Sequence, residues 1–186
     1  CTSEVHDMKK TIRDIDWSDK TAVVRCDFNV PLVNGKISDD TRIVAALPTI
    51  NYLRDNGAKV VILSHLGRPK GEPNDDFSLH PVAERLSERL GAHVNFIKSD
   101  LVVDNKVSEA VKNLDPSEVA LLENVRYRSE ETKNDPTFAR ELASLGDVFV
   151  QEAFGTAHRA HASTTGIADY IPAVSGFLIE KELKFL

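Results

Sequence analysis

Short apolar runs rich in β-branched residues alternate with helical patterns along the whole chain. The five runs lie at residues 21–26, 58–64, 93–97, 118–124 and 147–151. Each is almost continuously apolar, which is typical of a strand whose two faces are both buried. Strands that alternate with helices imply right-handed crossovers between parallel strands. The sequence therefore predicts an α/β fold, a Rossmann-like three-layer α/β/α domain with a mostly parallel sheet.

The segments between these runs carry helix signals. Residues 39–41 offer N-cap candidates for the first long helix, and Pro48 lies inside it, where proline can bend a helix. Ser78 is a candidate cap for a helix over residues 79–90. Further helices are predicted over residues 103–114, 135–145 and 177–186. The last pattern has no stop signal, so we expect more protein to follow.

The composition is that of an ordinary globular domain with a hydrophobic core. The chain has 186 residues and a formal net charge of −6, and this acidic balance argues against a broad nucleic-acid surface. No apolar run approaches the ~20 residues that cross a bilayer, and no secretory signal is seen. Cys1 and Cys26 form neither a disulfide framework nor a zinc spacing, so we expect a reduced, cytoplasmic protein.

Arginines follow the ends of four of the five predicted strands. They are Arg25, Arg68, Arg126 and Arg159, and Arg42 begins the first long helix. In open α/β sheets, ligands bind beyond the carboxyl ends of the strands. Because the chain as a whole is acidic, arginines gathered at that edge predict a local pocket for a small polyanion.

Each of these segments has a second interpretation when it is taken singly. Asp27 and Asn29 alternate around Phe28 and could recognise hydroxyl and carboxylate groups, but a turn explains this segment equally simply and is favoured from it alone. His65 and Arg68 could bind phosphate or belong to a basic surface loop.

The segments later in the chain also allow two interpretations each. Arg126 or Arg128 could face the cleft, although taken singly exposed ion pairs with nearby glutamates are favoured. His158 and His161 do not complete a zinc site and could belong to an anion-binding loop or pack in the core. No GxxxxGK[ST], GxGxxG or GxSxG motif is present, so no nucleotide site is recognised. The joint placement of the basic segments still favours a site.

Six stretches carry more information together than any of them carries singly. In chain order they are RCDFNVPL (25–32), ISDDTRIVAALPTI (37–50), VVILSHLGRPKG (60–71), LLENVRY (121–127), FGTAHRAHAST (154–164) and SGFLIEKELKFL (175–186). In this order, and over nearly the whole chain, they resemble the phosphoglycerate kinase family.

The resemblance implies an activity and a domain organisation. The family transfers a phosphoryl group between 1,3-bisphosphoglycerate and Mg-ADP, giving 3-phosphoglycerate and ATP, and its members are expected to be monomeric. It has an N-terminal α/β domain for the phosphoglycerate and a C-terminal one for the nucleotide. Residues 1–186 would be the N-terminal domain. Mg-ATP or Mg-ADP would be bound by the C-terminal domain, and this chain would hold neither nucleotide nor metal.

The resemblance also assigns residues. Asp27 and Asn29 resemble the groups that orient the hydroxyl and carboxylate end of the substrate. The non-transferred phosphate would be held by a basic patch of His65, Arg68, Arg126 and Arg159, with Arg25 nearby. Arg42 resembles the catalytic arginine that stabilises charge on the transferring phosphoryl group. His158 fits the family pattern without an assigned role. Gln151-Glu152 stands where the family usually carries Asn-Asp, and we expect this departure to affect loop packing more than catalysis.

Three functions compete at this point. The first is a domain that binds phosphoglycerate weakly and cannot turn over alone, because catalysis in the family needs two domains to close. The second is a non-catalytic anion-binding or regulatory module, against which the full set of substrate residues weighs. The third is a nucleic-acid-binding domain, against which the acidic charge weighs. We also expect a destabilised domain with an exposed apolar patch near Phe185 and Leu186.

Overall fold

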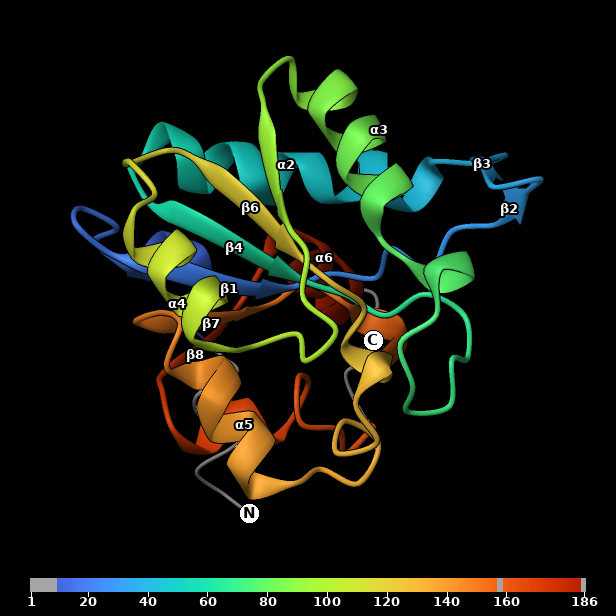
Figure 1. The fold of residues 1–186 in the computed structure, drawn as a ribbon. Helices are drawn as coiled ribbons and strands as arrows, with labels where there is room; N and C mark the ends of the chain where they lie inside the picture. The colour runs from blue at the N-terminus through green and yellow to red at the C-terminus, as the bar shows by residue number, and fades with distance from the viewer. Residues whose placement is uncertain (1–9, 157–158, 185–186) are drawn as a thin grey trace.

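A six-stranded sheet forms the centre of the computed structural model, which describes residues 10–156 and 159–184 (Figure 1). Every strand pair in this sheet is parallel. In spatial order the strands are β5 (Val94–Ile97), β6 (Val119–Leu122), β4 (Lys59–Leu63), β1 (Thr21–Arg25), β7 (Val148–Gln151) and β8 (Ala173–Ser175). Helices lie on both faces, so the predicted Rossmann-like three-layer α/β/α arrangement is confirmed.

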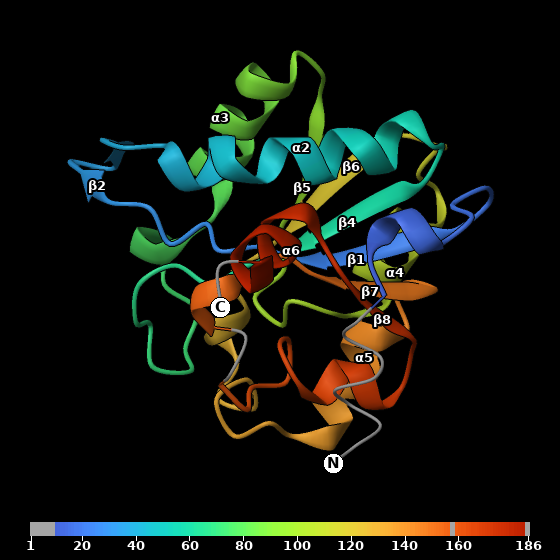
Figure 2. The same cartoon turned by 180° about the vertical axis from the view of Figure 1, so that it is seen from behind.

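The helices divide between the two faces of the sheet. They are α2 (Thr41–Asp55), α3 (His80–Leu90), α4 (Asn105–Lys112), α5 (Pro136–Ala143) and α6 (Phe177–Lys184). The first two pack on one face, and α4 and α5 pack on the other. Seen from behind, α6 lies beside α2 (Figure 2), and the rings of Tyr52 and Phe177 meet edge to face at 5.2 Å. None of the described helices is long and apolar enough to cross a membrane.

The order of the strands places a crevice at the end of β1. The chain runs from β1 to β4 on one side and reaches β7 on the other side only later. Such a reversal is a topological switch point, where α/β proteins bind ligands beyond the carboxyl ends of the strands. The last residues of β1, β4 and β7 are Arg25, Leu63 and Gln151, and they lie in register with one another.

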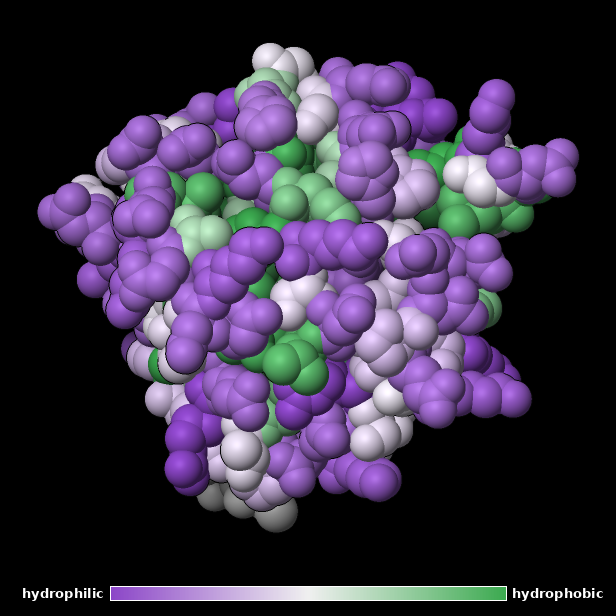
Figure 3. Space-filling model, in the orientation of Figure 1, coloured by the Kyte–Doolittle hydropathy of each residue, from purple (hydrophilic) through white to green (hydrophobic). Residues whose placement is uncertain are grey.

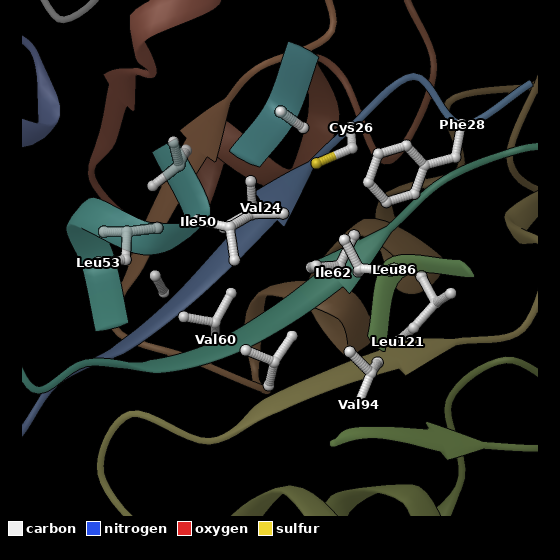
Figure 4. Packing of buried hydrophobic residues seen from close by; sticks show 14 of the residues in the cluster. Val24, Cys26, Phe28, Ile50, Leu53, Val60, Ile62, Leu86, Val94 and Leu121 are labelled. Atoms are coloured by element: carbon white, nitrogen blue, oxygen red, sulfur yellow. The ribbon is translucent and has the colours of Figure 1, made fainter. Parts of the chain in front are cut away.

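Alternate residues of the strands build two hydrophobic cores. On β1, Val24 packs toward α2 and α3, whereas Val23 belongs to the core under α4 and α5. The first core continues across β4 through Val60 and Ile62 to Ile50 of α2 (Figure 4). Burial of both faces explains why the sequence of these strands is continuously apolar instead of alternating.

Local signals set some of the helix ends. The prediction of Ser78 as the cap of α3 is wrong by one residue, because α3 begins at His80 and Leu79 holds the N-cap position without a side-chain cap. The Ser78 hydroxyl still accepts a hydrogen bond from the His80 N–H, and Gly91 ends α3 with φ 66°. Asp104 caps α4. The first long helix runs through Pro48 without interruption. Residues 185–186 lie outside the described residues, so the apolar patch expected there stays a prediction.

Three short strands were not predicted. β8 has only three residues, too few to show a periodicity, and it becomes a strand by pairing with β7. β2 (Leu32–Val33) and β3 (Lys36–Ile37) form an antiparallel hairpin around Asn34 and Gly35, which have φ 53° and 76°. Asn-Gly is a strong signal for a two-residue hairpin turn, and it was available in the sequence.

The surface in the view of Figure 3 is mostly hydrophilic, with an apolar patch between α3 and α4 where the edge strand β5 is partly exposed. An open hollow there is lined in part by Val94, Phe96, Ile97 and Leu114. The basic segments lie elsewhere, beyond the carboxyl ends of the central strands.

Candidate functional site

A basic hollow of about 400 Å³ is formed by the loops that follow β4, β6 and β7. The cations that line it are Arg68, Lys70, Arg126, Arg128, Lys133 and Arg159, together with His161. Among the described residues that line it there is no Asp or Glu. The predicted gathering of arginines at this edge of the sheet is therefore seen for Arg68, Arg126 and Arg159.

The backbone of Gly67 joins the segments that follow three different strands. Its N–H donates to Asn29 Oδ1 at 2.9 Å, and its carbonyl accepts a hydrogen bond from the Arg126 guanidinium at 3.3 Å. Gly67 has φ 60°, and a Cβ at this position would lie 2.5 Å from the ring of Phe77. A residue with a side chain would therefore have a strained backbone here, and its Cβ would overlap with the Phe77 ring. The loop after β4 is thus fixed against both neighbouring segments.

Asp27 and Asn29 follow β1 and lie beside Arg42 from the first turn of α2. The Arg42 guanidinium donates to Asp27 Oδ1 at 3.1 Å and to the Asn29 carbonyl at 2.9 Å. Phe28 between them is buried in the core, so the side chains of Asp27 and Asn29 both point away from the core. Asn29 N–H also donates to Asp27 Oδ1 at 3.2 Å, which is an Asx turn. The turn interpretation of this segment is therefore confirmed, and the recognition of hydroxyl and carboxylate groups by Asp27 and Asn29 stays a prediction.

Arg25 and His65 are buried side by side and are not among the described residues that line the hollow. Arg25 is fully buried, and His65 is only 4% exposed. One guanidinium nitrogen of Arg25 lies 2.9 Å from His65 Nδ1. Burial, together with the cations of Arg25, Arg126 and others, lowers the pKa of His65 to about 2. The ring is therefore neutral at physiological pH.

Arg126 and Arg128 have different surroundings, although they are two residues apart. Arg126 Nε is buried without a hydrogen-bond partner among the described residues, and burial plus nearby arginines lowers its pKa. Arg128 instead forms an ion pair with Glu130 at 2.6 Å and lies over the ring of Phe138. The ion-pair interpretation is correct for Arg128, whereas Arg126 lines the hollow and has its charged form favoured by Glu131.

Two residues at this site were not singled out from the sequence. Glu131 is fully buried, and its carboxylate accepts hydrogen bonds from the backbone N–H and the hydroxyl of Ser163. In the sequence, Glu131 was only one of several glutamates near Arg126, and Ser163 belonged to a segment without a phosphate-loop lysine. No local pattern could join them, because they are 32 residues apart and meet through the fold.

The histidines near β7 are only partly described. His158 lies outside the described residues. His161 is partly buried, its Nδ1 has no partner among the described residues, and burial lowers its pKa. Arg159 beside it is exposed and lines the hollow.

Gln151 and Glu152 hold loop backbones in place. The side-chain amide of Gln151 donates a hydrogen bond to the Thr164 carbonyl and accepts one from the Ala153 N–H. Glu152 Oε1 accepts the Leu178 N–H at the start of α6 at 2.7 Å, while its Oε2 is buried without a partner among the described residues. A Cβ at Gly176 would lie 2.7 Å from this carboxylate, so glycine makes room for it. Burial raises the pKa of Glu152 to about 7.

Comparison with known proteins assigns the chain. The family model for phosphoglycerate kinase matches residues 12–186. The chain belongs to the phosphoglycerate kinase family. Its basic hollow and the cluster of Asp27, Asn29 and Arg42 are thus features of one member of that family.

Individual relatives agree over almost the whole chain. The phosphoglycerate kinases of Clostridium botulinum (strain Hall) and Chloroflexus aggregans are 57% and 58% identical to it over 179 residues, which are 96% of this chain. The solved phosphoglycerate kinases of Coxiella burnetii and Pyrococcus horikoshii OT3 superpose with TM-scores of 0.83 and 0.85 at 41% and 38% identity, over 94% of this chain. The match covers 45% of each of the two curated relatives and 43% and 44% of the two solved chains.

Proposed function

We propose that this chain is the phosphoglycerate-binding, N-terminal domain of a phosphoglycerate kinase. The full-length protein would transfer a phosphoryl group reversibly between 1,3-bisphosphoglycerate and Mg-ADP, giving 3-phosphoglycerate and ATP. The observation that supports this most is the pairing of a basic hollow, in which no described lining residue is Asp or Glu, with a separate polar cluster at the end of β1. A ligand with a phosphate at one end and a carboxylate and hydroxyl at the other matches both parts.

The phosphate end would lie in the basic hollow. Arg68, Arg126 and Arg159 would bind it, because their charges crowd one another and a phosphate dianion would neutralise them. His65 would add a neutral donor from behind. In this structure Arg25 supports His65 and is itself closed off from solvent.

The other end would lie at the polar cluster. Asp27 and Asn29 would orient the hydroxyl and the carboxylate, and Arg42 would stand next to the transferring group. The Arg42 side chain is 53% exposed, so it is accessible to a ligand from the solvent side. Its catalytic effect would be electrostatic, since charge on the equatorial oxygens of the transferred group is stabilised by a fixed guanidinium.

The nucleotide and its metal are assigned elsewhere. Within residues 10–156 and 159–184, no three His, Cys, Asp or Glu side chains converge as metal ligands would. We assign Mg-ATP or Mg-ADP to the C-terminal domain of the full-length protein, which is also this domain's partner. The proposal includes a monomeric, cytoplasmic enzyme, with no nucleic-acid or membrane partner.

Isothermal titration calorimetry with 3-phosphoglycerate tests the binding half of this proposal. We expect saturable one-site binding to this chain, weakened about tenfold or more in Arg126→Ala, because one charge-assisted hydrogen bond contributes ~1.5–3 kcal/mol. Arg140→Ala removes an equal charge from an exposed position over Tyr170 and should bind like the wild type. An equal loss in both variants would reduce the effect to net charge, and no binding by the folded chain would refute the assignment.

A coupled assay for ATP formation tests the other half. The isolated chain should form no ATP from 1,3-bisphosphoglycerate and Mg-ADP, because it lacks the closure that brings both substrates together. ATP formation that scales with the concentration of the chain and disappears in Arg42→Ala would contradict the division of the site between two domains.

A further inference from the structure

A buried carboxylate lies at one end of a continuous chain of hydrogen bonds that ends at His65. Glu131 is fully buried and accepts hydrogen bonds from the Ser163 N–H at 2.8 Å and the Ser163 hydroxyl at 2.6 Å. The same hydroxyl oxygen accepts the Nε–H of Arg25 at 2.8 Å. Ser163 is also fully buried. The hydroxyl therefore has a fixed direction: it donates to the carboxylate and accepts from the arginine.

The chain of hydrogen bonds continues from Arg25 to His65. The Arg25 guanidinium also donates to the carbonyl of Cys26 and lies 2.9 Å from His65 Nδ1. An arginine can only donate hydrogen bonds, so Nδ1 must be the acceptor in this contact. A neutral imidazole that accepts at Nδ1 carries its proton on Nε2. The arginine therefore selects one of the two tautomers of His65.

The charges around the ring hold it neutral. Besides Arg25, the cations that act on His65 are Arg126 and Arg159, and with burial they oppose a further proton. Glu131 is the counter-charge of this group, since it favours the charged forms of Arg25, Arg126 and His161. A buried arginine without a counter-charge is costly, so the carboxylate is what allows Arg25 to lie behind the ring.

We propose that Glu131 and Ser163 are positioning residues of the phosphoglycerate site. Through Arg25 they fix the ring and the tautomer of His65, so that its Nε2–H is kept ready as a donor to an anionic ligand. The inference rests on the proposed function for the identity of that ligand. The state of the ring in the free protein does not depend on it, and this separates the two tests.

A purely structural role predicts something different. If Glu131 and Ser163 only hold two loops together, breaking their contact lowers stability and leaves the imidazole unchanged. Ser78 provides a matched control, because its hydroxyl donates to the buried carboxylate of Glu123 at 2.9 Å. Ser78→Ala therefore removes a similar serine–glutamate hydrogen bond that does not lead to His65.

The experiment is nitrogen-15 NMR of the histidine side chains in the free 186-residue chain. The wild type should show an unprotonated Nδ1 and a protonated Nε2 at His65, and Ser78→Ala should show the same. In Ser163→Ala the ring should exchange between both tautomers. Glu131→Gln keeps the shape of the side chain and removes its charge, and it provides a second variant with the same expected result. A wild-type ring protonated at Nδ1, or an unchanged tautomer in both variants, would overturn the inference.

Calorimetry with 3-phosphoglycerate completes the test. We expect Ser163→Ala to bind about tenfold more weakly than the wild type, the loss of one aligned hydrogen bond, and Ser78→Ala to bind normally. Equal affinity of Ser163→Ala and the wild type would overturn the positioning role. If the wild type did not bind at all, the proposed function would fail, while the tautomer result would still decide whether Glu131 and Ser163 set the state of His65.

Discussion

Glu152 should make the stability of this domain depend on pH. The residue is 1% exposed, one carboxylate oxygen accepts the Leu178 N–H, and the other has no partner among the described residues. Burial raises its pKa from 4.5 to about 7. The folded state therefore holds this proton more tightly than the unfolded state does. The stability that the proton contributes is fully present below about pH 4.5 and is lost as the pH rises toward 7.

The size of the effect follows from the shift in pKa. A raised pKa from 4.5 to about 7 corresponds to a loss of roughly 3 kcal/mol once the pH is above both values. Between about pH 5 and pH 8 most of that loss, ~2–3 kcal/mol, should be measurable. Glu152→Gln stays neutral at every pH and can still accept the Leu178 N–H. The difference in unfolding free energy between variant and wild type should therefore change by ~2–3 kcal/mol in favour of the variant over this range.

Urea unfolding of both proteins at several pH values measures this difference directly. Other titrating groups cancel, because they are the same in the two chains. Glu109→Gln makes the same chemical change on an exposed part of α4 and should shift stability by less than ~0.5 kcal/mol. A difference between Glu152→Gln and wild type that stays constant from about pH 5 to pH 8 would refute the reasoning.

Three further predictions concern single residues. Gly146→Ala should lower the unfolding free energy by ~1–3 kcal/mol, because its Cβ would lie 2.8 Å from the Thr21 carbonyl oxygen and 2.6 Å from a Val23 methyl group; an unchanged urea midpoint would contradict this. Asp104→Ala removes the N-cap of α4 and should cost about 1 kcal/mol in the same assay, and no loss would show that the cap is dispensable. The His65 ring should not titrate between about pH 5 and pH 8 in an NMR series, since burial and nearby cations lower its pKa to about 2, and a midpoint near its ordinary value would disprove this.

The central strands could be predicted because their signal is local. Five apolar runs predicted five of the six sheet strands. In β1, β4, β6 and β7, burial on both faces leaves a nearly continuous apolar pattern, whereas β5 is a partly exposed edge strand. β8 could not be found in this way, because its three residues become a strand only through pairing with β7. The Asn34-Gly35 hairpin was predictable from turn chemistry and was missed.

In the candidate site, too, some features could be predicted from the sequence and others depend on contacts that only the fold makes. Arg68, Arg126 and Arg159 could be placed together because a parallel sheet brings the ends of its strands to one edge. The sequence could not show that Arg25 is fully buried, or that Arg128 is paired, since both depend on contacts made by the folded chain. The roles of Glu131 and Ser163 could not be predicted for the same reason, because the two residues are 32 positions apart and their contact leaves no local pattern in the sequence.

A residue-resolved NMR titration of this chain with two ligands tests the central claim most directly. Inorganic phosphate and 3-phosphoglycerate are added separately, and the shifts of the two halves of the site are compared. We expect both ligands to shift the signals of Arg68, Arg126 and Arg159, whereas only 3-phosphoglycerate should shift those of Asp27 and Asn29. Identical shifts from the two ligands, or shifts from neither in a well-dispersed spectrum, would contradict a phosphoglycerate site with one end in the basic hollow and the other at the end of β1.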